Sequence, residues 1–186
     1  MTDTEATPQS GRKPRADAER NRQLLLDIAK TKFAVKGGAA TLDEIAKAAG
    51  VGIGTLYRHF PTREALLEQV YRNESDQLAA AAHSLKEGHP HWEALRQWLL
   101  LFADYLANKQ LMSEAVNASP AAGPQLNEAV NLLVANAEGK SGRQLPLTGP
   151  EMLAAIAGVV NVGGRADRGA GAQGLVDIMV LGMQRT

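Results

Sequence analysis

The side chains best suited to chemistry lie in one short stretch, Ile53 to Phe60, which reads IGTLYRHF. At about 100° per residue, a helix through this stretch would gather its polar side chains on one side, away from its apolar ones. These polar side chains are Thr55, Arg58 and His59. An exposed hydroxyl, guanidinium and imidazole can form hydrogen bonds with base edges and with phosphate oxygens. The pattern therefore favours a surface that binds nucleic acid.

Two short helices joined by a glycine turn would hold this surface. Thr41 and Glu44 have the spacing of a capping box, which predicts a helix that begins near Leu42. Gly50 can adopt the positive φ that ends such a helix, and a second helix follows over Ile53 to His59. This arrangement is typical of a helix-turn-helix, which presents its second helix to the DNA major groove. The alternative is an ordinary helical hairpin with a solvated face.

The longer run Gly50 to Leu67, GVGIGTLYRHFPTREALL, resembles the DNA-reading segment of the tetracycline-repressor-like (TetR) family of bacterial transcription regulators. The shared features are the glycine turn, the Thr-Leu-Tyr helix, the His-Phe pair and a basic residue before a long fourth helix. The resemblance covers roughly residues 18 to 72.

By this resemblance, Thr41 would contact phosphate, Thr55, Arg58 and Ile53 would face bases, and Tyr57, His59 and Arg63 would grip the DNA backbone. Ile53 is apolar where other members often carry a polar residue that reads bases.

The composition of the 186 residues predicts an all-α protein of one large or two small domains. Alanine and leucine dominate, aromatic residues are few, and the absence of cysteine excludes disulfides and cysteine-ligated metals. The uncharged stretch Met152 to Gly164 is too short to cross a bilayer, and the polar first ten residues do not resemble a secretory signal. We therefore expect a soluble, cytoplasmic protein.

The charges divide unevenly along the chain although the net charge is zero. Residues 1–72 contain twelve Lys or Arg against nine Asp or Glu, whereas residues 73–186 contain eight against eleven. A basic first part suits contact with phosphates. Residues 1–16 should be a disordered tail, and its cations Arg12, Lys13 and Arg15 could either solubilise the chain or reach DNA as an arm.

The resemblance implies that the remainder divides into a DNA-binding domain, residues 17–62 with its motif at 41–60, and a ligand-binding and dimerisation domain, residues 63–186. The expected helices span residues 17–36, 42–49, 53–59, 63–85, 92–109, 111–116, a segment through 126–137, 148–161 and 173–185. Residues 163–174 should be a mobile connection. The expected core of the first domain comprises Leu25, Ile28, Phe33, Ile45, Leu56, part of Tyr57, and Phe60.

Apolar stripes in the second domain have two readings, because a helical core and a ligand pocket share the same periodicity. By resemblance, the core of this domain is also the pocket, and its expected walls and polar contacts are Leu99, Phe102, Tyr105, Leu106, Met112, Val116, Asn117 and Leu133. The resemblance also implies that the last two helices pack against a second subunit. The expected interface residues are Leu153, Ile156, Val160, Leu175, Ile178 and Met179, although a helix buried within one subunit would look the same.

Other motifs do not support an enzyme. Gly169, Gly171 and Gly174 form a G-x-G-x-x-G string, but no strand precedes it and no acidic residue follows at the required distance. His89 and His91 lack a carboxylate at ligand spacing, so no metal site is expected. We find no nucleophile elbow or Walker loop and expect no cofactor.

The sequence thus predicts a homodimeric transcription regulator, a repressor that a small molecule releases from a palindromic operator in double-stranded DNA. The alternative is a helical ligand-sequestering or adaptor protein that retains an unused DNA-binding head.

Overall fold

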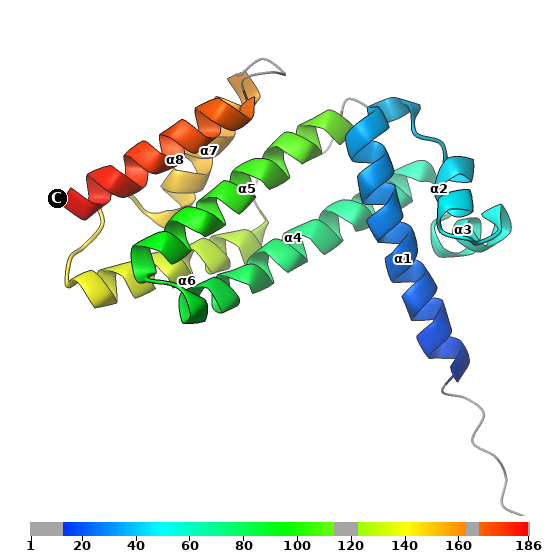
Figure 1. Cartoon of the computed structure of the whole chain (residues 1–186), viewed down its shortest axis with the longest axis horizontal. Coiled ribbons are helices and arrows are strands. Elements are labelled where there is room, and N and C mark those ends of the chain that lie inside the picture. Colours follow the sequence, from blue (N-terminus) through cyan, green and yellow to red (C-terminus); the bar gives the residue numbers. More distant parts are fainter. Residues whose placement is uncertain (1–12, 114–122, 163–167, 186) are drawn as a thin grey trace, which may run out of the picture. The chain divides into compact units, whose positions relative to one another are not determined.

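The computed structural model describes residues 13–113, 123–162 and 168–185. Within these ranges all regular structure is helical, which confirms the all-α prediction (Figure 1). The helices are α1 (Lys13–Lys36), α2 (Leu42–Ala48), α3 (Ile53–His59), α4 (Arg63–Gly88), α5 (His91–Ser113), α6 (Pro124–Ser141), α7 (Gly149–Val162) and α8 (Arg168–Arg185), with a 3-10 turn at Gly37–Ala39.

The chain forms two compact units that divide between Val70 and Tyr71, within α4. We call the first unit the head and the second the body. The predicted domain boundary after residue 62 falls at the start of α4, so the head includes about two more helical turns than expected.

In the head, the local signals placed α2 and α3 correctly. The amide of Glu44 donates to Thr41 Oγ1 at 3.2 Å, and the Glu44 carboxylate accepts from the Thr41 amide at 3.2 Å, so the predicted capping box is present. Gly50 has the predicted positive φ, +67°. α3 spans the predicted residues Ile53–His59.

The core of the head is built from α1, α2, α3 and the first turns of α4. α1 packs against α2, and α2 packs against α3. Of the expected core residues, Ile28 is only partly buried, and Tyr57, of which only a part was expected in the core, is 49% exposed. The buried apolar residues are Leu25, Leu26, Ala29, Phe33, Ala40, Ile45, Ala46, Ala49, Leu56, Phe60, Leu66, Leu67 and Val70.

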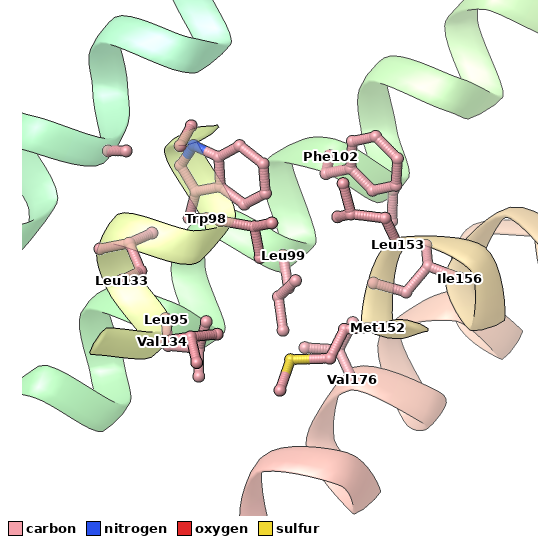
Figure 2. Close-up of a cluster of buried hydrophobic side chains, with 14 of the residues drawn as sticks. Leu95, Trp98, Leu99, Phe102, Leu133, Val134, Met152, Leu153, Ile156 and Val176 are labelled. Carbon is pink, nitrogen blue, oxygen red and sulfur yellow. The ribbon is translucent and has the colours of Figure 1, made fainter. Parts of the chain in front are cut away.

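The body is organised around α5, which packs against α6, α7 and α8. Figure 2 shows side chains from these helices pointing into one common interior, among them Leu99, Leu133 and Met152. Trp98 is fully buried, stacks on Phe102 at 6.0 Å between ring centroids, and donates from its indole nitrogen to the carbonyl of Leu78 at 2.8 Å. The Thr148–Glu151 capping box predicted at the start of α7 is also present.

Two predicted breaks in the body differ from the described helices. α5 continues through Ser113, so there is no interruption before Leu111, and the rest of the expected 111–116 helix lies outside the described residues. α8 begins at Arg168, so the second half of the connection expected at residues 163–174 is helical. Burial of Ala172 stabilises this glycine-rich turn, because tertiary packing outweighs weak helix propensity. Among the described helices, none has the length and apolar character needed to cross a bilayer.

Candidate nucleic-acid interface

The burial pattern of α3 fixes which of its sides is exposed. Leu56 and Phe60 are fully buried and anchor the helix in the core of the head. Arg58, about 180° from the midpoint of these two positions on the helical wheel, is exposed, while Thr55 and His59 are partly exposed beside it. The polar arc predicted from the sequence therefore lies outside the core.

Backbone hydrogen bonds hold α3 at a fixed turn from α2. The amide of Gly50 donates to the carbonyl of Lys47 at 3.1 Å, and the amide of Val51 donates to the carbonyl of Ala46 at 3.0 Å. The carbonyl of Gly52 then accepts from the amide of Thr55 at 2.9 Å as α3 begins. A short helix fixed in this way can present its side chains at defined positions.

Thr41 lies exposed at the start of α2. Its hydroxyl oxygen accepts the capping bond from Glu44, and a hydroxyl that accepts one bond retains a proton that it can donate. Lys36 Nζ pairs with Glu44 Oε1 at 2.6 Å. The hydrogen bond from Lys36, followed by the backbone bond from Thr41, lowers the pKa of Glu44 below its ordinary value. The charge of Lys36 is therefore partly balanced within the head.

Arg63 has internal partners that the sequence did not predict. Its guanidinium donates to the carbonyl of Ala40, to that of Gly38 at 3.1 Å and to that of Gly37 at 3.4 Å. It also lies over the Phe33 ring, 4.8 Å from the centroid. Arg63 thus connects the start of α4 to the 3-10 turn and α1, instead of extending toward solvent as a phosphate-gripping side chain would.

The tail residues can be placed only in part. Lys13 and Arg15 lie in the first turn of α1, which begins four residues before the expected Asp17. Their side chains, and all of Arg12, lie outside the described structure.

Four of the predicted ligand-binding residues belong to the packed core of the body: Leu99, Phe102, Leu106 and Leu133. Tyr105 is partly buried against them. The side chain of Met112, together with Val116 and Asn117, lies outside the described residues.

The body also carries polar groups beside this core. The Tyr71 hydroxyl donates to the carbonyl of Lys109 at 3.1 Å. Burial raises the pKa of Tyr71 to about 12, and burial followed by the charge of Glu74 raises the pKa of Tyr105. Both phenols therefore remain protonated, and can donate hydrogen bonds, at neutral pH.

A separate open groove of about 350 Å³ lies between α4 and α6. Its lining comprises Ala79, Ala80, His83, Gln125, Glu128, Ala129 and Leu132. None of the predicted ligand residues that the structure describes is among them.

The predicted dimer residues divide into buried and exposed ones. Leu153, Ile156 and Val160 are buried in the core of a single chain, which leaves them almost no surface to offer a second subunit. Leu175 and Met179 are partly buried against the same core. Ile178, by contrast, is 72% exposed on α8.

Several residues on exposed surfaces were not predicted from the sequence. Gly54 lies on the exposed side of α3. The helical rotation of about 100° per residue would have predicted this position from the sequence. Val162 and Leu181 are exposed apolar residues on α7 and α8. Leu181 could have been predicted, because it lies three residues after Ile178 and therefore on the same side of the helix.

Comparison with known proteins gives a family match over the head. Residues 25–70 match the family described as bacterial regulatory proteins, tetR family. The crystal structure of TetR transcriptional regulator SCO0520 from Streptomyces coelicolor is similar to 87% of this chain and 97% of that chain, with 36% sequence identity and a TM-score of 0.70.

Two curated relatives match over shorter regions. HTH-type transcriptional regulator SAR0097 of Staphylococcus aureus (strain MRSA252) is 26% identical over 123 residues, which are 65% of this chain and 64% of that protein. HTH-type transcriptional repressor KstR2 of Rhodococcus jostii (strain RHA1) is 40% identical over 79 residues, which are 42% of this chain and 36% of that protein. The chain thus spans less than two thirds of the length of either relative. The match to SCO0520 extends over nearly all of both chains, through head and body alike, and on this ground the protein belongs to the TetR family of bacterial transcription regulators.

Proposed function

We propose that this protein is a homodimeric, ligand-responsive regulator that binds a palindromic DNA operator and represses transcription until a small molecule releases it. The observation that carries the proposal is the exposed polar side of α3 in a head whose sequence matches the TetR family. The name of the Rhodococcus relative, a transcriptional repressor, supports repression over activation. Such a regulator would act in the cytoplasm, where bacterial DNA lies.

Within this proposal, the residues of the head have different roles. Arg58 would bond the acceptors of a guanine, and Thr55 would contact a base edge or phosphate. Tyr57, His59 and Thr41 would hold the DNA backbone, and Arg12, Lys13 and Arg15 would add an arm. Arg63 would act indirectly, because its guanidinium is already engaged with the carbonyls of the 3-10 turn. The hydroxyls and the imidazole of this surface would position the head, whereas Arg58 would select sequence.

The proposal requires two heads. One short recognition helix contacts too few bases to select an operator, so a dimer should place two copies in major-groove segments about 34 to 36 Å apart. The exposed apolar residues Ile178 and Leu181 on α8, together with Val162 on α7, support an interface through these helices, because exposed apolar surface can mark a contact between proteins. The interface would therefore use the outward sides of these helices.

The body would bind the effector. Apolar residues around Leu99 and Phe102 would enclose it, and Tyr105 would donate a hydrogen bond, which its raised pKa supports. The effector can release DNA only if it binds one arrangement of the two heads more tightly than the other. Displacement of the bound operator by a panel of small molecules, with the fluorescence of Trp92 and buried Trp98 as an independent signal, would identify such a compound.

Operator selection from random double-stranded DNA tests the proposal directly. The full-length protein should enrich a palindromic sequence and bind it selectively at physiological salt. Arg58→Ala should then weaken specific binding by about 1 to 3 kcal/mol and relax selectivity at one base step. A protein that enriches no sequence would instead fit the ligand-sequestering or adaptor function, and the regulator proposal would be abandoned.

A further inference from the structure

The start of α3 exposes one aliphatic side chain beside the polar side of the helix. Ile53, the first residue of the helix, is 38% exposed, although its neighbours Leu56 and Phe60 are fully buried. A branched hydrocarbon cannot form a hydrogen bond with a base edge or a phosphate. If this surface binds DNA, Ile53 can contribute only by contact with another apolar group.

The surroundings of Ile53 leave room for close approach. Gly54 follows it, and no atom lies within 4 Å of the position that a Cβ on Gly54 would occupy. Helical spacing places Tyr57 on the Ile53 side of Gly54 and Arg58 on the other side. This face of α3 therefore has an apolar edge and a cationic edge, separated by bare backbone.

The major groove offers one apolar group among the base edges. Thymine carries a C5 methyl group there, whereas adenine, guanine and cytosine present hydrogen-bond donors and acceptors. Burying an isoleucine against the amino group of cytosine would remove that donor from water without a partner, which is unfavourable. An isoleucine at this position should therefore discriminate in favour of thymine.

We propose that Ile53 is a specificity-determining residue that reads the C5 methyl group of a thymine at one fixed position in each operator half-site. This inference rests on the proposed function, since it requires that α3 enter the major groove. It assigns to Ile53 a different kind of readout from that of Arg58, so the two side chains should control different base steps.

The test uses the full-length protein and the operator that it selects from random DNA. Each thymine is replaced in turn by deoxyuridine, which removes only the methyl group, and the dissociation constant is measured by fluorescence anisotropy. Losing one buried methyl contact should weaken binding roughly fourfold per half-site at the thymine that Ile53 contacts. The other thymines should show little change.

Variants then link the effect to this side chain. Ile53→Ala should bind the thymine operator more weakly and should lose the difference between thymine and deoxyuridine at that position, as a double-mutant cycle requires. Val35→Ala is the matched control, because Val35 is an aliphatic residue on α1 that is 79% exposed. It should retain the full methyl effect. Thermal unfolding of each variant checks that the head is intact.

Two results would overturn the inference while leaving the proposed function in place. One is an operator that is bound selectively but tolerates deoxyuridine at every thymine. The other is a methyl effect that persists unchanged in Ile53→Ala. Failure to select any operator would instead count against the proposed function itself, and the inference would fall with it.

Discussion

Two arginines five residues apart have different surroundings, which favour different roles in the proposed regulator. Arg58 extends from the exposed side of α3, whereas Arg63 donates to backbone carbonyls and lies over Phe33. The family resemblance alone would give both side chains a place on DNA. The structure separates them, because a guanidinium that already satisfies carbonyl groups contributes to the stability of the head.

Arg63→Ala should therefore lower the free energy of unfolding, by about 1 to 3 kcal/mol, because it removes the donors that the carbonyls of Gly37, Gly38 and Ala40 use. Arg63→Lys should recover little, since an ammonium cannot reproduce the planar fork. Urea denaturation followed by circular dichroism measures both. Arg58→Ala is the control and should unfold like the wild type. Equal losses of unfolding free energy for Arg58→Ala and Arg63→Ala would contradict the different roles proposed for the two arginines.

The capping pair at α2 predicts a dependence on pH. The folded pKa of Glu44 is lowered from 4.5, first by Lys36 and then by the Thr41 amide. A carboxylate whose pKa falls on folding stabilises the protein above its unfolded pKa, and this contribution is lost as the pH falls through the folded value. Glu44→Gln should remove this part of the acid destabilisation.

The measurement compares the stability of wild type and Glu44→Gln from pH 7 to pH 3. The difference between them should shrink below about pH 4.5. Lys36→Gln removes the first cause of the shift and should give an intermediate result. Glu151, whose pKa is lowered by hydrogen bonds from Thr148 in the body, remains in every variant. The stability of the variants should therefore still fall at acid pH. A gap between the two proteins that stays constant over the whole range would show that Glu44 does not titrate differently on folding.

At the scale of elements, two glycines of the helix-turn-helix should respond to alanine in opposite ways. Gly50 has φ +67°, so Gly50→Ala strains the turn and should destabilise the head by about 1 to 2 kcal/mol. Gly54 lies inside a helix with open space around it, so Gly54→Ala should stabilise α3 by up to about 1 kcal/mol. Thermal melting of both variants provides the test.

Gly54→Ala should nevertheless weaken operator binding, because the new methyl group lies on the side of α3 that faces DNA in the proposed complex. Stability and affinity would then change in opposite directions. If the Gly54→Ala variant were more stable and bound DNA as well as the wild type, Gly54 would not be part of the interface.

The elements that could be predicted are those with local signals. Thr41 and Glu44 mark the start of α2, Gly50 marks the turn, and both are properties of neighbouring residues. The first turns of α8 could not be predicted, because their glycines have weak helix propensity and the burial of Ala172 in the body is a tertiary contact. The contacts of Arg63 could not be predicted either, because its carbonyl partners lie 23 to 26 residues away in the chain.

The predicted dimer residues also depend on tertiary contacts that the sequence pattern does not reveal. α7 is apolar on several sides, so periodicity could not distinguish Ile156, which faces the core of its own chain, from Val162, which is 88% exposed. Only tertiary contacts decide which apolar side is already covered. The outward residues identified by the structure replace the buried ones in the proposed interface.

At the scale of the whole molecule, the proposed regulator depends on the outward surface of α7 and α8. A charge at the centre of an apolar interface would be buried without a partner, which costs several kcal/mol, whereas the same charge on a free surface costs little. Ile178→Glu should therefore convert the dimer to a monomer without unfolding the chain. Sedimentation velocity measures the mass, and circular dichroism checks the fold.

The monomeric variant should also lose selective operator binding, because only one recognition helix would reach the palindrome at a time. Val35→Glu places the same charge on a similarly exposed aliphatic position of α1 and should leave both mass and binding unchanged. If Ile178→Glu remained a dimer, the subunits would have to meet elsewhere. If it became a monomer and still bound the full operator with wild-type affinity, two linked heads would not be needed, and the dimeric mechanism would be wrong.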